Sequence, residues 1–488
     1  MLFHSIDFII FFPVVVFAYF LLPDKWKNIW LLVASYYFYM SWNAKYGLLL
    51  FGASMITYIG SLLVNHFCKK RGYQRVVLVI ALLMVFGCLV YYKYTNFLVG
   101  CWNQVITFLG GTLIVPSFDI ILPVGISFFT FQAAGYLIDV YRGDVEVEKN
   151  PIDYLLFVSF FPQLVAGPIE RSHHLLRQMH CHQAFDRARV QRGLSIMLWG
   201  YFLKLVIADR CAVFVDHLFV SYEDHGFSIL FLGAVMFSIQ IYCDFMGYST
   251  IARGAALVLG YELMDNFCQP YFATSIQEFW RRWHISLSTW FKDYVYIPLG
   301  GNRCSKLRHY FNLMITFLVS GLWHGADWSY VIWGGIHGAL QVFGNFLRPF
   351  TDGICKGLHV NVESVGVRIF RILRTDFLVV LVWVFFRASN LWEGKAYLQQ
   401  MFTGGLRINE WFDQTVYSFG LNEFQIRMLL CGVVIMFLFS LMRERGIAVM
   451  QWLGKQHVVF RYAVHWVLVF MVALSFSLAS QEFVYFQF

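Results

Sequence analysis

Three histidines lie in or beside strongly apolar sequence, where an ionisable side chain is costly to place. His324 follows the apolar run 311–319 in the motif Ser-Gly-Leu-Trp-His-Gly. His337 lies in Trp-Gly-Gly-Ile-His-Gly, and His284 lies in Trp-Arg-Arg-Trp-His-Ile-Ser. Imidazole titrates near neutral pH, so each ring is suited to accept a proton from a hydroxyl group. These residues are therefore candidates for general base catalysis.

Each candidate also has a structural interpretation. His324 is equally well read as a packed histidine bonded to a helix carbonyl. The glycines beside it, Gly321 and Gly325, would let backbone or substrate approach closely. His284, taken alone, favours an interfacial histidine wetted by lipid headgroups. His337 favours a structural role, in which it bonds across helices through contacts between small residues.

A histidine-rich loop follows residue 167 and contains His173, His174, His180 and His182. Imidazole and the neighbouring Cys181 thiolate are good metal ligands. Their spacing matches no established zinc pattern, so we interpret this loop as solvated and basic and predict no metal site. The chain also lacks the G-x-S-x-G, H-E-x-x-H, P-loop and G-x-G-x-x-G signatures of soluble-type catalytic and nucleotide sites. A pump or channel remains an alternative, because Asp139, Asp209 and Asp244 could carry protons.

The composition indicates the setting in which these residues act. The 488-residue chain is 59% hydrophobic and 14% charged, whereas soluble domains have roughly 25% charged residues. A soluble protein of this length has too little interior for so many apolar side chains. The net charge of +8 comes from basic residues between apolar runs, which indicates positive-inside topology rather than nucleic-acid binding. The scattered cysteines contain no CxxC motif and favour packed thiols over disulfides.

The apolar stretches predict an all-α polytopic membrane protein. Several are shorter than the ~20 residues of a perpendicular span, so tilted or re-entrant helices are expected. We predict about eleven transmembrane helices in a single domain, 1–488, not all of which need cross fully. They are drawn from an N-terminal segment within 1–26 and from eleven further stretches near 29–42, 46–67, 76–99, 120–140, 194–219, 228–243, 310–323, 328–349, 375–387, 425–441 and 462–481. The basic clusters near residues 69–75 and 443–461 are predicted to be cytoplasmic, which places both termini outside.

The segment 275–296 carries most of its charge beside tryptophans, in the sequence SIQEFWRRWHISLSTWFKDYVY. We predict a single amphipathic helix at the cytoplasmic interface. Ser275 is placed to cap its start, and Glu278 is the capping-box partner.

Two blocks of sequence resemble the membrane-bound O-acyltransferase family. They are 242–303, which ends in Pro-Leu-Gly-Gly-Asn-Arg, and 319–338, which contains the Trp-His-Gly motif. The stretch 157–171 and the terminal Val-Tyr-Phe-Gln-Phe are similar to the bacterial alginate O-acetyltransferase branch. The chain departs from that branch at Met246 and Thr250, where a Ser and an acid are usual, so no carboxylate role is expected at 250.

The resemblance implies a ring of tilted helices around a central funnel, with interfacial and re-entrant helices. It makes His324 the signature histidine and His284 the other family histidine. It also implies a bacterial inner-membrane enzyme that takes acetyl from cytosolic acetyl-CoA, with no permanently bound cofactor. The acetyl group would pass to an extracytoplasmic partner protein that acetylates an exported polysaccharide.

Chemistry and resemblance together predict His324 as the base and His284 as a group that orients the donor or completes a proton relay. Basic residues of the same region would bind the coenzyme A phosphates, or merely reflect positive-inside bias: Arg281, Arg282, Lys292, Arg303, Lys306 and Arg308. The alternatives are another acyl cargo, such as D-alanine or a lipid acyl chain, and a transporter of acetyl groups that catalyses no transfer.

Overall fold

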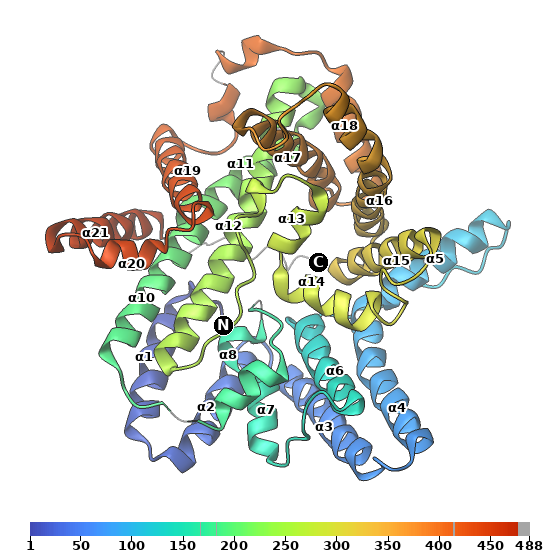
Figure 1. Cartoon of the computed structure of the whole chain (residues 1–488), viewed down its shortest axis with the longest axis vertical. Helices are drawn as coiled ribbons and strands as arrows, with labels where there is room; N and C mark the ends of the chain where they lie inside the picture. Colours follow the sequence, from blue (N-terminus) through green and yellow to red (C-terminus); the bar gives the residue numbers. More distant parts are fainter. Residues whose placement is uncertain (166, 182, 413–414, 477–488) are drawn as a thin grey trace. The chain divides into compact units, whose positions relative to one another are not determined.

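Helices joined by loops form the part of the chain that the structure describes, with no β-strand in it (Figure 1). This computed structural model describes residues 1–165, 167–181, 183–412 and 415–476. Two compact units divide the chain. Unit 1 combines residues 1–197 with 249–264, and unit 2 combines 198–248 with the described part of 265–488. The all-α prediction is confirmed, and the single-domain prediction stays a prediction.

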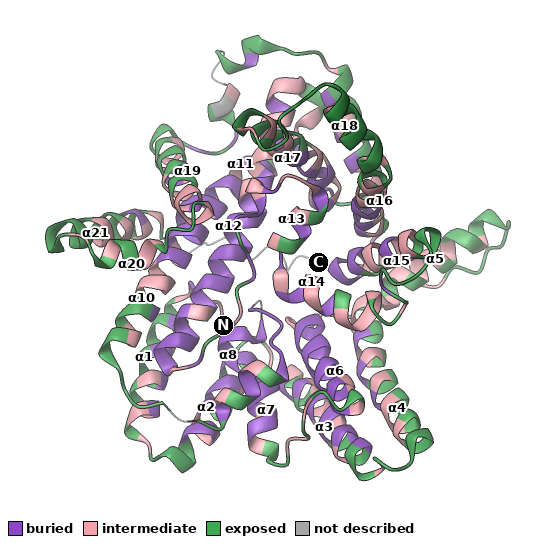
Figure 2. Ribbon diagram, in the orientation of Figure 1, coloured by how far each residue is buried: buried purple, intermediate pink, exposed green. Residues whose placement is uncertain are grey.

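Unit 1 contains the N-terminal helices. Its elements are α1 (Ile6–Leu21), α2 (Asp24–Met40), α3 (Ala44–His66), α4 (Arg71–Leu89), η1 (Val90–Tyr94), α5 (Thr95–Phe108), α6 (Ile126–Arg142), α7 (Pro151–Ser159), α8 (Phe161–Leu164), η2 (Ser172–Leu176), α9 (Arg177–Met179), most of α10 (Arg187–Tyr201) and the end of α12 (Phe227–Leu259). α3 packs against α4 and α6, and α2 packs against α7. The buried faces of α6 and α7 are visible in Figure 2. The Tyr154 hydroxyl donates to Thr57 Oγ1 at 2.7 Å, which joins α7 to α3.

Unit 2 contains the three candidate histidines, His284, His324 and His337. After the end of α10, its elements are η3 (Phe202–Ala208), α11 (Asp209–Val220), η4 (Tyr222–Asp224), the first part of α12, η5 (Pro270–Phe272), α13 (Ile276–Arg282), α14 (Ile285–Phe291), η6 (Lys292–Tyr296), α15 (Lys306–His324), α16 (Trp328–Gly357), α17 (Val365–Arg387), α18 (Leu391–Thr403), η7 (Ile408–Trp411), η8 (Thr415–Ser418), α19 (Glu423–Glu444), α20 (Val449–Gly454) and α21 (Val458–Ser475). α16 packs against α13, α15 and α17.

Five helical segments among the described residues are long and apolar enough to cross a membrane: Ala44–His66, Arg71–Phe108, Phe227–Leu259, Glu423–Glu444 and Val458–Ser475. Large apolar side chains on them are exposed, such as Leu83 at 67% and Phe470 at 61%, as expected for lipid-facing helices. The chain is therefore a multi-pass membrane protein. The count of about eleven spans stays a prediction, because stretches such as 194–219 contain charged residues.

The predicted single helix over 275–296 is wrong. α13 ends at Arg282, and the chain turns through Trp283 and His284 before α14 begins. The predicted cap is confirmed in part. Ser275 Oγ accepts a hydrogen bond from the Glu278 N–H at 3.2 Å, but the Glu278 carboxylate accepts from the Thr274 N–H and hydroxyl. Because of this break, His284 lies in the turn between two short helices and not on one continuous surface helix.

Candidate active site

His284 lies at the turn between α13 and α14, in the left-handed backbone region with φ of 43°. Such a backbone conformation is strained for a residue with a side chain and needs support from its surroundings. Asn266 supplies that support. Its carbonyl accepts from the Ile285 N–H at 2.9 Å, and its side-chain Oδ1 accepts from the Ser286 hydroxyl at 2.6 Å. The loop after α12 therefore fixes the position of this histidine.

The His284 side chain is fully buried, at 0% exposure. Phe245 of α12 contacts its ring edge-on, with centroids 4.6 Å apart. Burial lowers the pKa of His284 to about 3, because the protein interior disfavours the charged imidazolium. The turn lies outside the candidate spans. The interpretation of His284 as an interfacial, wetted histidine is wrong, and its imidazole is neutral at physiological pH.

His324 is the last residue of α15 and is also buried, at 3% exposure. Its ring packs against Trp333 of α16 and Phe386 of α17, with centroids 5.0 and 5.5 Å away. The centroids of the His324 and His284 rings lie 6.5 Å apart. The structure therefore brings together the two histidines that the motifs single out, one from the turn before α14 and one from the end of α15.

Glycines allow α15 and α16 to cross at this point. A Cβ on Gly321 would lie 2.3 Å from the Tyr330 carbonyl oxygen, and one on Gly325 would lie 2.1 Å from the Tyr330 ring. Neither contact is sterically possible, so both positions require glycine unless the helices separate. Of the two roles that the sequence suggested, close approach of the protein itself is the one observed.

His337, the third candidate, is buried between tryptophans. Its ring centroid lies 5.1 Å from both Trp280 and Trp333. Both ring nitrogens are buried and have no hydrogen-bond partner among the described residues. The expected hydrogen bond across helices is thus absent from the described part of the chain, and aromatic contacts hold the ring.

Aromatic side chains form a wall that the sequence analysis missed. Trp333 contacts both His324 and His337, and it stacks on Trp383 of α17 with centroids 5.5 Å apart. Trp383 in turn contacts Trp283 at 5.0 Å. The tryptophans of 275–296 were assigned to a membrane interface, yet Trp283 is fully buried. This wall surrounds the histidines with low-polarity side chains.

A buried ion-pair network joins η3, α11 and α12, directly beside Phe245 in the sequence of α12. Lys204 of η3 places its ammonium 2.9 Å from Asp209 and 2.8 Å from Asp244, and both Lys204 and Asp244 are almost fully buried. The π-helical turn at η3 is a feature common at functional sites. Asp209 and Asp244 had been considered as proton carriers. Lys204 was missed, although a lysine inside the stretch 194–219 was a visible signal.

Four of the six basic residues predicted to bind donor phosphates differ in their surroundings. Arg282 forms ion pairs with Glu278 and Glu444, each at 2.6 Å. The side chains of Arg281, Lys292 and Arg303 are exposed. Arg282 is therefore part of an internal charge network, while the other three have the exposure that a phosphate-binding surface requires. Their binding role stays a prediction.

The membrane-bound O-acyltransferase family model matches residues 147–374, which contain both histidines and most of the aromatic wall. Probable alginate O-acetylase AlgI of Pseudomonas aeruginosa is 38% identical over 90% of this chain and 82% of its own length. The chain belongs to the membrane-bound O-acyltransferase family. It is an O-acyltransferase, and the predicted resemblance is confirmed.

Two further relatives of this O-acyltransferase differ in their named cargo or acceptor. The peptidoglycan O-acetyltransferase of Helicobacter pylori is 38% identical over 78% of this chain and 76% of its own length. The teichoic acid D-alanyltransferase of Streptococcus thermophilus is 30% identical, over 44% of this chain and 55% of its own length. The similarity to the acetyl-transferring proteins thus covers much more of the chain. The terminal motif that suggested the alginate branch lies outside the described residues.

Proposed function

We propose that this O-acyltransferase takes an acetyl group from cytosolic acetyl-CoA and passes it across the bilayer to an extracytoplasmic acceptor, for O-acetylation of an exported or cell-wall polysaccharide. The observation that carries the proposal is the buried pair of His284 and His324, with ring centroids 6.5 Å apart. The names of the acetyl-transferring relatives, alginate O-acetylase and peptidoglycan O-acetyltransferase, supply the cargo and the type of acceptor. A bacterial inner-membrane location and an extracytoplasmic partner protein belong to the same proposal.

The chemistry needs one proton acceptor. The acceptor hydroxyl gives its proton to an imidazole nitrogen of His324 as its oxygen attacks the thioester carbonyl. The new C–O bond forms, the C–S bond breaks, and the coenzyme A sulfur leaves as a thiolate that takes up a proton to become the thiol. The thioester is already activated, so positioning of the two substrates accounts for much of the remaining rate enhancement.

His284 acts as a positioning residue next to the base. Its pKa of about 3 keeps it neutral, so it donates or accepts a hydrogen bond without adding charge near the reacting groups. The surrounding tryptophans exclude water, which suppresses hydrolysis of the thioester. Arg281, Lys292 and Arg303 bind the phosphates of coenzyme A on the cytosolic side.

The test uses purified protein in proteoliposomes of known orientation, with radiolabelled acetyl-CoA, palmitoyl-CoA or a D-alanyl carrier protein as the donor on the cytosolic side. The lumen holds an extracytoplasmic extract of the source cells, which supplies the partner protein, together with mannuronate polymer or peptidoglycan fragments. Release of free coenzyme A thiol and labelling of the polymer or fragments are both measured. The proposal expects both signals with acetyl-CoA. Transfer from only the D-alanyl carrier or palmitoyl-CoA would overturn the acetyl assignment. Movement of label without thiol release would support a transporter.

A further inference from the structure

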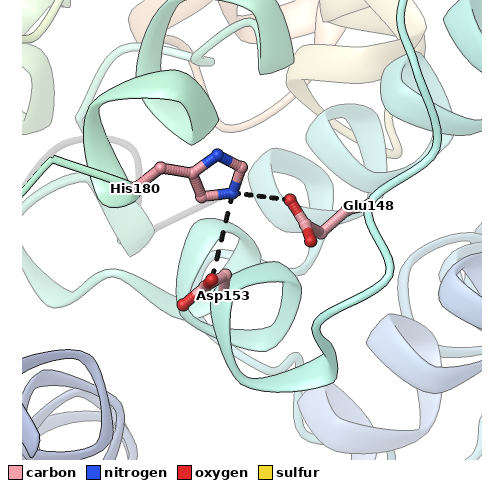
Figure 3. Close-up of side chains that lie close together, drawn as sticks. All are labelled: Glu148, Asp153 and His180. Atoms are coloured by element: carbon pink, nitrogen blue, oxygen red, sulfur yellow. Dashed lines mark hydrogen bonds and ion pairs between the residues drawn. The ribbon is translucent and has the colours of Figure 1, made fainter. Parts of the chain in front are cut away.

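A compact group of metal-ligating side chains lies in unit 1. Figure 3 shows His180 pointing toward Glu148 and Asp153. The His180 Nε2 atom lies 2.7 Å from Glu148 Oε2 and 3.9 Å from Asp153 Oδ2. Each of the three residues offers one ligand atom, and these atoms lie within 4.8 Å of one another. Among the described residues, this is the only such group of three or more.

The two carboxylates are held in place by their own hydrogen bonds. Asn28 Nδ2 donates to Asp153 Oδ1 at 2.6 Å, and Asn150 Nδ2 donates to Asp153 Oδ2 at 2.7 Å. The Asn150 backbone N–H donates to Glu148 Oε1 at 2.8 Å. Hydrogen bonds that orient ligating carboxylates are typical of metal sites, where they fix the ligand geometry.

Asn28 also ties the histidine to the same group. Its Nδ2 donates to the carbonyl of Met179, the residue before His180, at 2.9 Å. The side chain of Asn28 is 8% exposed, and its buried Oδ1 has no hydrogen-bond partner among the described residues. The Asn28 amide therefore holds Asp153 through Nδ2 and keeps an unused buried acceptor.

The charge balance of the group favours a cation. Asp153 is 8% exposed, and the Glu148 side chain is 10% exposed. Neither carboxylate forms an ion pair with a lysine or arginine among the described residues, so a single imidazole faces two acids. Buried carboxylates of this kind are normally paired or coordinate a metal. A divalent ion would neutralise both and leave the imidazole to coordinate in its neutral form.

A pocket of about 370 Å³ lies beside two of the three ligands, Asp153 and His180, and Lys25 also lines it. It is lined by Asp153, His180, Asn28 and Asn150, so water molecules have room to complete a coordination shell. One imidazole nitrogen with two carboxylate oxygens is a donor set that suits Zn²⁺, and Mn²⁺ is its nearest competitor.

We propose that Glu148, Asp153 and His180 form a binding site for one divalent transition-metal ion of the zinc class. The ion would join three segments of unit 1, namely the loop after α6, the start of α7 and the end of α9. This site goes beyond the proposed acetyl transfer and does not depend on it. The sequence analysis predicted no metal, because the ligands come from separated segments and not from the spaced histidines of one loop.

A matched control lies close by in the sequence. His174 also contacts a carboxylate, Glu170, at 2.7 Å, but this pair has no third ligand among the described residues. Both His174 and His180 thus contact a carboxylate, but only His180 also lies near a second carboxylate that completes a set of three ligands. His174→Gln should leave metal binding unchanged, while His180→Gln and Glu148→Gln should weaken it.

The test measures metal content and affinity in tag-free protein that was purified without chelator. Elemental analysis should give one zinc equivalent per chain. After metal depletion, Zn²⁺ titration against a fluorescent chelator should show at least about tenfold weaker binding for Glu148→Gln and His180→Gln, since removing even outer-shell partners costs that much. Substoichiometric metal, or equal affinity for the wild type and both variants, would overturn the site.

A second measurement on the wild type covers the case in which the variants fail to fold. Zn²⁺ should slow the modification of His180 by diethyl pyrocarbonate, mapped by mass spectrometry, and leave His174 unaffected. Equal rates at His180 with and without Zn²⁺ would contradict the proposal, as would equal protection of both histidines.

Discussion

The imidazole rings of His284 and His324 lie with their centroids 6.5 Å apart, although one residue sits at a turn before α14 and the other ends α15. The two rings meet edge-on at 60°, at a separation within the range of aromatic contacts, so the two imidazoles are direct neighbours. Asn266 fixes the turn at His284, and the glycines of α15 fix the helix that ends at His324. Substitutions at the His284 turn and at the glycines near His324 should therefore change stability and acyl transfer.

The pH dependence of stability should report the buried, neutral His284. Its pKa falls from 6.5 in the unfolded chain to about 3 in the folded chain. The unfolded state therefore binds more protons between these values, and stability is present in full above about pH 6.5 and declines as the pH falls toward 3. His284→Asn removes the titrating group and tolerates positive φ. Its melting temperature should fall less between pH 7.5 and pH 5.5 than that of the wild type. An equal fall would show that His284 is not held neutral by burial.

The crossing of α15 and α16 should be intolerant of a single methyl group. Gly321→Ala would place a Cβ 2.3 Å from the Tyr330 carbonyl oxygen, and overpacking of this kind costs about 1–3 kcal/mol. We expect a lower melting temperature and reduced acyl transfer, because His324 follows directly on this turn. Gly344→Ala is the control, since a Cβ at that position of α16 meets nothing within 4 Å. Similar behaviour of the two variants would contradict the close crossing.

Lys204 should be essential for the packing of η3, α11 and α12, because it pairs with a carboxylate on each of the two helices. Lys204→Met would leave the carboxylates of Asp209 and Asp244 without their cation, and breaking a buried ion pair costs about 3–5 kcal/mol. Expression and melting temperature should both fall. Adding Asp244→Asn to Lys204→Met should recover part of the loss, because one uncompensated charge is removed. Additive losses in this double-mutant cycle would mean that the residues do not interact.

The basic residues near the site should separate into two groups by kinetics. Arg282→Gln breaks the ion pairs with Glu278 and Glu444 and should lower thermal stability. Arg303→Gln and Lys292→Gln alter exposed side chains and should raise KM for acetyl-CoA, with melting temperature unchanged. The rise should shrink at high salt, since exposed charges are screened. Unchanged KM values would assign these residues to positive-inside bias alone.

Sequence reasoning found the all-helical fold, the family and both motif histidines, because apolar runs and the blocks 242–303 and 319–338 are local signals. It failed where the outcome depends on distant partners. The left-handed turn at His284 requires Asn266, which lies on another segment, so the pattern of 275–296 alone predicted one helix. The aromatic wall and the Lys204 network were missed for the same reason. Trp333, Trp383 and Asp244 meet their partners only through tertiary packing.

The most direct test of the account is the single-turnover rate of acetyl transfer from radiolabelled acetyl-CoA in proteoliposomes, comparing wild type with His324→Ala at matched protein level and melting temperature. Donor binding is measured in parallel, and His66→Ala, an exposed histidine at the end of α3, is the control. The account predicts a loss of about a hundred- to ten-thousand-fold in rate for His324→Ala, with donor affinity retained and the control unaffected. A near wild-type rate in His324→Ala would contradict the assignment of His324 as the base.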